Sequence, residues 1–187
     1  FSPIYAGAVS LFVKDTVKIS KLRKYIFIYG NTNLKKIYNL NYKNIVLKKN
    51  LVQSGSKIYV REFLRHEDSH PSDIIEIHNR PNYFHLIYNS AKKQKIVLYF
   101  HNDPLTMTGS RSVADRKKLL ANAGKIIFNS HWSRKRFLED IEGLHINSEK
   151  MMVIYQSAHP TKVNLKDKKK WITFVGKLNR AKGYDLF

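Results

Sequence analysis

The sequence predicts an α/β fold with a doubly wound, mostly parallel sheet, and three observations support this prediction. Short apolar runs alternate with longer segments of helical period along most of the chain. Turn-forming residues end the apolar runs, as Gly30-Asn31 does after the first of them, which is typical of strands. Hydrophobic residues make up 43% of the sequence and aromatic residues 12%, which is enough to build a core.

Seven apolar runs are predicted to be strands, each short and rich in β-branched or aromatic residues. Strands that alternate with helices are joined by right-handed crossovers. Ligands bind beyond the carboxyl ends of the strands in such sheets, so we expect the segments after Tyr29, Ile77, Phe100 and Phe128 to meet at one cleft. The predicted strands are residues 25–29, 44–47, 73–78, 95–100, 125–128, 151–155 and 171–175.

Five segments with apolar residues at helical spacing are predicted to be helices. Either Ser110 or Ser112 can cap the fourth, and Ala123 with Gly124 ends it. The fifth is expected to bury Trp132 together with Phe137, Leu138 and Ile141. The predicted helices are residues 8–20, 58–64, 83–91, 110–122 and 130–141.

The chain is strongly basic, with 34 Lys and Arg against 14 Asp and Glu and a formal net charge of +20. This balance favours polyanionic partners such as an anionic lipid surface, nucleic acid or phosphorylated substrates. A purely compositional origin of the positive charge is the alternative, because lysine, asparagine and isoleucine are abundant throughout.

The 187 residues contain no cysteine, which excludes disulfides, thiolate metal sites and cysteine nucleophiles. No apolar run approaches the ~20 residues of a membrane span, so a cytoplasmic protein is expected.

The domain organisation is predicted from a change in composition near the end of the chain. Residues 1–157 are expected to form one domain, residues 158–170 a linker with the lysine-rich run 166–170, and residues 171–187 the start of a second domain. The sequence begins without methionine and stops within an amphipathic segment. We therefore expect it to be a fragment.

Three predicted strand ends carry polar residues that a buried strand does not need. They are His78-Asn79-Arg80-Pro81, His101-Asn102-Asp103-Pro104 and Asn129-Ser130-His131-Trp132. Imidazole, amide and guanidinium groups suit sugar hydroxyls and phosphates, which require directional donors and acceptors. The spacings of His66, His70, His78 and His85 do not suggest a metal site.

These segments resemble the family-4 glycosyltransferases of the GT-B fold. Residues 2–8 resemble the small-residue loop that opens the first helix, and residues 71–81 the strand that ends in histidine. Residues 96–103 resemble the next strand of the family, and residues 125–133 resemble the family's strand-serine-helix step. Residues 174–185 resemble the start of the second domain. The resemblance covers nearly the whole chain in the right order.

The resemblance implies two Rossmann-like domains that face each other across a cleft, with this chain forming one half of the GT-B architecture. The first domain would bind a saccharide or lipid-linked acceptor, and the second a nucleotide-sugar donor. Glycosyl transfer would retain the anomeric configuration and need neither a cofactor nor an obligatory metal. The expected process is cell-envelope polysaccharide biosynthesis, in the cytoplasm or peripherally at the inner face of its membrane.

The resemblance also assigns site residues. His101 matches the family's reaction-centre histidine, and Lys177 and Lys182 are the expected contacts to the donor diphosphate. Lys177 stands where the family usually has arginine, so the bidentate fork is lost. The paired-glutamate motif of the family would follow Phe187. The expected substrate-binding residues are Gly7, His78, Asn79, Arg80, Asn102, Asp103 and Ser130.

Each assignment has a structural alternative. His101 can instead cap a turn before Pro104, His78 with its neighbours can form a packing turn, and Gly7 can serve only helix entry. The alternative functions are a GT-B sugar-nucleotide epimerase, a basic nucleic-acid-binding module and a non-catalytic remnant. A nucleic-acid-binding module would need a basic groove with exposed aromatic residues, and the sequence shows no such interleaving, so no nucleic acid is expected.

Overall fold

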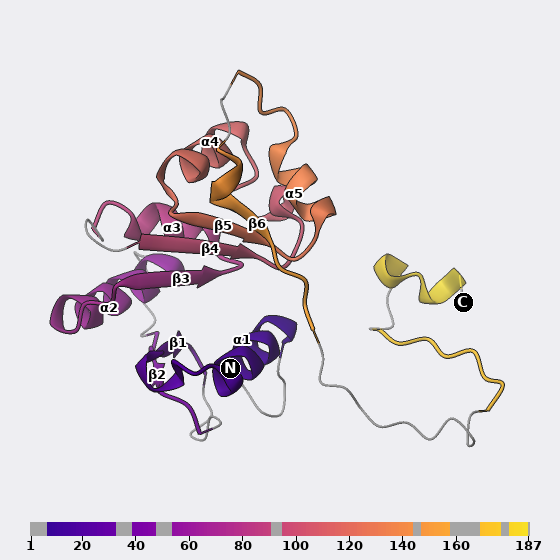
Figure 1. Ribbon diagram of the computed structural model, residues 1–187, viewed down its shortest axis with the longest axis horizontal. Coiled ribbons are helices and arrows are strands. Elements are labelled where there is room, and N and C mark those ends of the chain that lie inside the picture. The colour runs from indigo at the N-terminus through magenta and orange to yellow at the C-terminus, as the bar shows by residue number, and fades with distance from the viewer. Residues whose placement is uncertain are drawn as a thin grey trace. The chain divides into compact units, whose positions relative to one another are not determined.

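The computed structural model describes residues 7–32, 39–47, 54–90, 95–143, 147–157, 169–176 and 180–186 (Figure 1). The chain divides into two compact units, residues Phe1–Gln156 and Ser157–Phe187. The first unit ends next to the predicted boundary at residue 157. Most of the predicted linker, residues 158–168, lies outside the described residues.

The first unit is built on a four-stranded, wholly parallel sheet, as the sequence predicts. Its strands follow one another in chain order: β3 (Ile74–His78), β4 (Lys95–Phe100), β5 (Lys125–Phe128) and β6 (Met151–Val153). Ile77, Leu98, Ile126 and Met151 form one row across the sheet. The bounds of β4 and β5 are those predicted from sequence.

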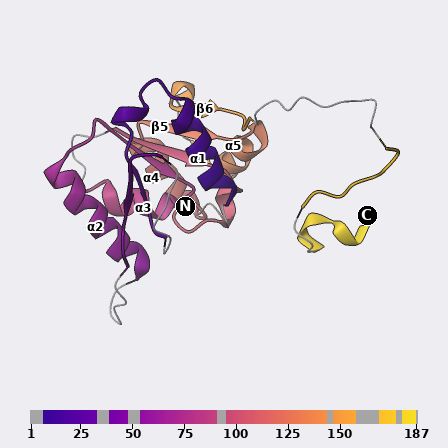
Figure 2. The ribbon, with the colours of Figure 1, turned by 90° about the horizontal axis from the view of Figure 1, so that it is seen from below.

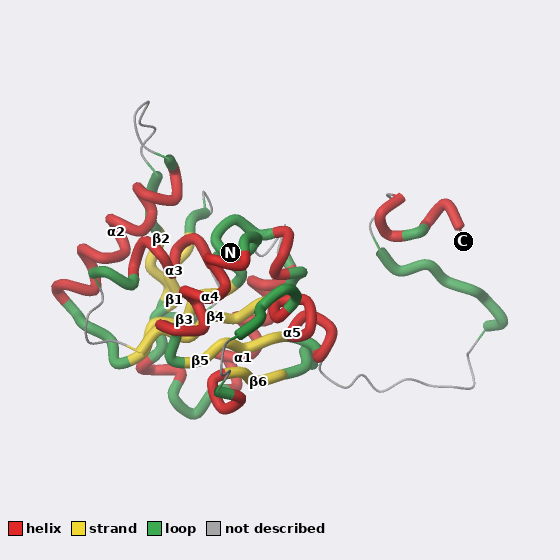
Figure 3. The backbone as a smooth tube through the Cα atoms, turned by 90° about the horizontal axis from the view of Figure 1, so that it is seen from above, coloured by secondary structure: helices red, strands yellow, loops and turns green. Residues whose placement is uncertain are grey.

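Helices cover both faces of this sheet, which makes the unit a Rossmann-like α/β domain. Right-handed crossovers between strands in consecutive order place the intervening helices on one face. That face carries α3 (Pro81–Ile87), α4 (Val113–Asn122) and α5 (His131–Leu138). The helix α1 (Ala8–Ile19) lies on the other, as the opposite views of Figures 2 and 3 show.

Alternate residues of the strands build the core on the face that carries α3, α4 and α5. Leu98, Phe100, Ile126 and Phe128 are completely buried there. The ring of Phe137 from α5 lies 5.4 Å from that of Phe100 and 5.3 Å from that of Phe128. Complete burial of one such side chain stabilises the fold by about 1.5–3 kcal/mol. The intervening strand residues face α1.

A second, two-stranded parallel sheet is formed by β1 (Ile28–Gly30) and β2 (Tyr42–Asn44). Both strands differ from the predicted ranges 25–29 and 44–47. A strand exists only where its backbone finds a partner, and pairing is limited to Ile28–Gly30 with Tyr42–Asn44. Within the described residues, no further strand pairs with the outer edges of β1 and β3.

The helix starts also correct the sequence prediction. The helix α2 (Gly55–Ser69) begins before residue 58, because the Ser54 side chain accepts a hydrogen bond from the Lys57 N–H. Pro81 occupies the first position of α3, where its missing N–H costs nothing. Ser112 caps α4, whereas the buried Ser110 hydroxyl donates to the Pro104 carbonyl at 2.6 Å.

The predicted burial of Trp132 is wrong, since 58% of this side chain is exposed. The helix α5 is short, and its buried face is occupied by Ser133 and Phe137, one turn apart. Trp132 instead lies against the Arg136 guanidinium, with 5.8 Å between the guanidinium carbon and the ring centroid.

The second unit lacks the strand predicted at residues 171–175. Residues 171–176 have no regular structure, and short 3-10 turns follow at η5 (Arg180–Lys182) and η6 (Tyr184–Leu186). The side chains of Trp171, Ile172 and Val175 are largely exposed. The described part of this unit offers no neighbouring strand, and an apolar run alone does not form one.

Candidate functional site

The carboxyl ends of four strands meet at His101. His78 ends β3, His101 follows β4, Asn129 follows β5, and Gln156 lies three residues beyond β6. Each of the other three hydrogen-bonds to His101. The predicted convergence is therefore present after β3, β4 and β5. The segment after β1 is not among these contacts, since Asn31 bonds the Ile45 carbonyl beside β2.

Two asparagine side chains hold the backbone of His101. The Asn79 carbonyl oxygen Oδ1 accepts from the His101 N–H at 3.2 Å and from the Asn102 N–H at 3.3 Å. The Asn129 amide donates to the His101 carbonyl at 2.8 Å. Asn79 has a left-handed φ of 57°, which asparagine tolerates better than most residues. This side chain, predicted to bind substrate, thus positions the residue predicted to be catalytic.

The imidazole of His101 is enclosed, with only 7% of the residue exposed. Its ring stacks on Tyr99 with 4.3 Å between centroids and meets the edge of Phe12 from α1 at 5.0 Å. Its Nε2 lies 3.0 Å from His78 Nδ1, and its Nδ1 lies 2.9 Å from Gln156 Nε2. Burial and, to a smaller extent, the neighbouring His78 lower the pKa of His101 to about 4, against the opposing effect of Glu76. His101 is therefore neutral at pH 7.

Glu76 contacts the ring nitrogen of His78 that does not face His101. Its Oε1 lies 2.9 Å from His78 Nε2. This hydrogen bond holds the pKa of the Glu76 carboxyl below its usual value, against the effect of burial. The carboxylate is accordingly ionised at neutral pH and accepts a hydrogen bond from His78 Nε2.

Two of the predicted substrate-binding residues, Asp103 and Ser130, make structural contacts beside His101. Asp103 Oδ1 accepts from the Leu105 N–H at 3.0 Å, and Oδ2 lies 3.4 Å from Arg136. The Ser130 hydroxyl caps α5 by accepting from the Ser133 N–H at 3.1 Å. These contacts account for both residues without a ligand.

Arg80 and Asn102 are exposed near the same strand ends. Arg80 occupies the N-cap position of α3, and the backbone of Asn102 is bonded to Asn79. Both side chains are accessible to a ligand at the carboxyl edge.

Gly7 precedes α1 and is exposed. Its carbonyl accepts from the Leu11 N–H at 3.1 Å and from the Ser10 hydroxyl at 2.8 Å. A Cβ atom at this position would meet nothing within 4 Å, so packing of the described residues does not require glycine here.

The predicted diphosphate contacts belong to the second unit. Lys182 is exposed in η5, and Lys177 lies outside the described residues. The structure therefore does not relate either lysine to His101.

The site residues that sequence reasoning missed include Glu76, Gln156 and Phe12. Glu76 had a usable signal, because residues two apart on a strand share a face and Glu76 precedes His78 by two. Gln156 had none, because it is separated from His101 by 55 residues. Phe12 falls within the helix predicted at residues 8–20, but its contact with His101 depends on how α1 packs.

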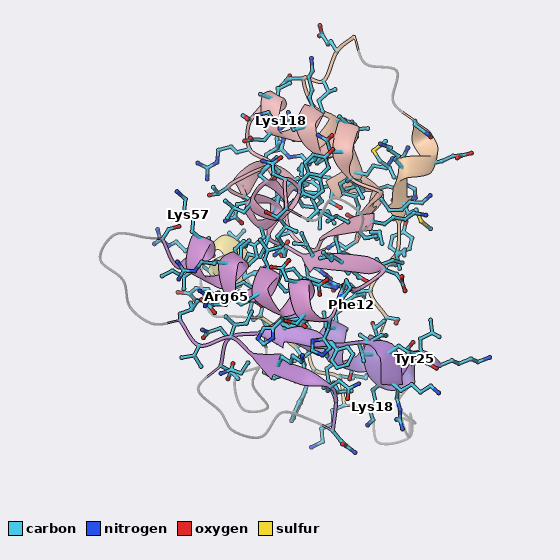
Figure 4. The ribbon with its side chains drawn as sticks, turned by 90° about the vertical axis from the view of Figure 1, so that its left-hand side faces the viewer. Phe12, Lys18, Tyr25, Lys57, Arg65 and Lys118 are labelled. Carbon is cyan, nitrogen blue, oxygen red and sulfur yellow. The ribbon has the colours of Figure 1, made fainter. Side chains whose placement is uncertain are left out.

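A separate open hollow of about 350 Å³ lies on α2 and includes Leu86 of α3. Its lining is mainly apolar and basic, and Lys57 and Arg65 are visible there in Figure 4. None of the residues around His101 lines it. Among the described residues, no cluster of three or more histidine or acidic side chains is placed to hold a metal ion.

The sequence was compared with known proteins. A scan against models of known protein families finds no match, and no curated protein is significantly similar to the chain. Within the described residues, no helix has the length and apolar character needed to cross a membrane. The class defined by the structure itself is a Rossmann-like α/β domain with a histidine-centred polar cluster at the carboxyl edge of its sheet.

Proposed function

We propose that this chain is the acceptor-side domain of a GT-B glycosyltransferase, followed by the first residues of its nucleotide-sugar domain. The observation that carries the proposal is the cluster of His101, His78 and Gln156 at the carboxyl ends of parallel strands. Ligands of doubly wound sheets bind at this edge. The family resemblance of the sequence adds the reaction: retaining transfer from a nucleotide-sugar to a saccharide or lipid-linked acceptor.

The chemistry of the cluster fits a carbohydrate substrate. Imidazole nitrogens, amides and the exposed Asn102 and Arg80 provide directional partners for hydroxyl groups. The enzyme's main tasks would be to position the acceptor and to stabilise the negative charge of the departing diphosphate. Lys177 and Lys182 would serve the second task once the complete second domain is formed. No cofactor or obligatory metal is part of the proposal.

A product assay on the full-length protein tests this function. We expect glycosylated acceptor from one member of a panel of nucleotide-sugars, and no product from residues 1–187 alone, because on this proposal residues 171–187 supply only the start of the donor-binding domain. Turnover by residues 1–187 alone would contradict the proposed division of labour. Epimerised nucleotide-sugar without acceptor glycosylation would favour the epimerase alternative. Binding to nucleic acid that weakens steeply with salt would favour the basic binding module.

A basic and apolar surface on the α1 side supports a cytoplasmic enzyme held peripherally at an anionic membrane. We define this surface, the α1 patch, by Lys18, Ile19, Lys21, Leu22 and Tyr25 (Figure 4 shows Lys18 and Tyr25). Its apolar members are 62–70% exposed. Apolar side chains among lysines are typical of interfacial binding, to which each lysine adds about 1 kcal/mol. Lipid-linked acceptors reside at such a surface.

A further inference from the structure

The side chains of Glu76, His78, His101 and Gln156 form one continuous hydrogen-bonded chain. The three successive distances are 2.9 Å from Glu76 Oε1 to His78 Nε2, 3.0 Å from His78 Nδ1 to His101 Nε2, and 2.9 Å from His101 Nδ1 to Gln156 Nε2. Every ring nitrogen of the two histidines is thus engaged within the protein. The positions of the protons follow from what each partner can donate or accept.

The assignment starts at Glu76, whose ionised carboxylate only accepts. His78 must therefore carry its proton on Nε2, and a neutral His78 then offers a lone pair at Nδ1. His101 Nε2 faces that lone pair and must supply the proton. The neutral His101 is left with a lone pair at Nδ1, which the Gln156 amide satisfies as a donor. Both imidazoles are neutral in this arrangement, and no contact sets two protons or two lone pairs against each other.

Neighbouring aromatic rings fix the orientation of the His101 ring, and the hydrogen-bonded side chains fix the position of its proton. Tyr99 stacks on one side at an interplanar angle of 8°, and Phe12 meets the ring edge-on. The segment that carries Gln156 is also held, because the Ile154 carbonyl accepts from the Tyr99 hydroxyl at 2.8 Å. Gln156 itself is exposed, unlike His101.

We propose that Glu76 and His78 are positioning residues that keep the proton of His101 on Nε2, and that Gln156 occupies the place of a substrate hydroxyl at Nδ1. A hydroxyl that displaces the exposed Gln156 amide donates to the same lone pair. His101 consequently acts on substrate as a hydrogen-bond acceptor and not as a donor. The substitution of Gln156 by a substrate hydroxyl and this last consequence rest on the proposed glycosyltransferase function, whereas the proton assignment stands on the structure alone.

The test reads the tautomer directly by NMR. In ¹⁵N-histidine-labelled protein at pH 8, two-bond proton-nitrogen correlations distinguish the protonated from the unprotonated ring nitrogen. We expect the Nε2–H form of His101 to exceed the Nδ1–H form by about tenfold or more, the ratio that one net hydrogen bond supports. A predominant Nδ1–H form in the unmodified protein would overturn the proposal.

Matched variants separate positioning from packing. Gln156→Glu replaces the donor by an acceptor of the same length and should move the proton to Nδ1, whereas Gln156→Met should leave it on Nε2. Glu76→Gln keeps an acceptor for His78 and should preserve the tautomer ratio, but Glu76→Leu should reduce the ratio severalfold. Unchanged ratios in both Gln156→Glu and Glu76→Leu would also overturn the proposal. If the tautomer behaves as expected but His101→Ala retains full turnover in the complete enzyme, the proposed function is wrong. The positioning role of Glu76 and His78 is then still supported.

Discussion

The two faces of the four-stranded sheet are made by the same strands but by different chemistry. On the face with α3, α4 and α5, Leu98 and Ile126 are completely buried among apolar side chains. On the face with α1, the neighbouring positions carry Glu76, His78 and His101, joined to one another by hydrogen bonds. Alternation along a strand separates the two sets. The comparison teaches that stability and the candidate chemistry should respond to different substitutions.

The largest expected effect is on the apolar face. Leu98→Ala should lower the free energy of unfolding by about 2–5 kcal/mol, because it removes buried contacts and leaves a cavity in the middle of the sheet. Chemical denaturation of residues 1–187 measures this loss. The hydrogen-bond chain on the other face should persist, which the His101 tautomer ratio reports. A loss below 1 kcal/mol would contradict the separation of the faces.

The matching substitution on the polar face is His101→Ala, made in the full-length form of the proposed glycosyltransferase. Turnover should fall by roughly tenfold to a thousandfold, as when one positioned polar contact to a transition state is removed. The unfolding free energy should fall by less than in Leu98→Ala. His85→Ala is the control, because His85 bonds the Gly109 carbonyl on the opposite side of the sheet and should change turnover much less. Normal turnover of His101→Ala would refute the site assignment.

Lowering the pH should also reduce the free energy of unfolding, through His101 on the polar face. The pKa of His101 is lowered from 6.5 to about 4 by folding, so between these pH values the unfolded chain binds the extra proton and the folded chain does not. The contribution of the neutral His101 to the free energy of unfolding is fully present above pH 6.5 and is lost as the pH falls towards 4. The total is about 3 kcal/mol. Denaturation curves from pH 7.5 to 4.5 measure it.

His101→Phe is the control for the acid effect, since it keeps an aromatic ring but cannot titrate. The variant should lose less stability than the unmodified protein over the same pH range. Equal slopes for the two proteins would show that His101 does not cause the acid sensitivity.

The smallest expected effect concerns the α1 patch. Lys18→Gln with Lys21→Gln should weaken binding to anionic vesicles by about 2 kcal/mol, or roughly thirtyfold, since each lysine adds about 1 kcal/mol. Lys117→Gln with Lys118→Gln on α4 removes the same charge from another exposed surface and serves as the control (Figure 4). Vesicle sedimentation compares the pairs. Equal losses would indicate that net charge, and not the patch, drives binding.

The sequence predicted the middle of the sheet better than its margins. The strands β4 and β5 have the predicted bounds because each is an uninterrupted apolar run after its first lysine, with every apolar residue buried or partly buried. The runs at residues 25–29 and 171–175 have similar composition, yet the first is displaced and the second forms no strand. Composition signals the capacity to form a strand, whereas pairing decides whether it forms.

The sequence by itself also determined which residues stand at the strand ends, and so His78 and His101 were recognised as a candidate site. Only the tertiary structure decided what these residues contact. The bond between His78 and His101 depends on the register of β3 against β4, and the bond to Gln156 joins residues 55 apart. Asp103 and Ser130 look like ligand-binding residues in the sequence but are engaged by local turns. Local patterns reveal which groups are available, but hydrogen-bond partners are fixed by packing between distant segments.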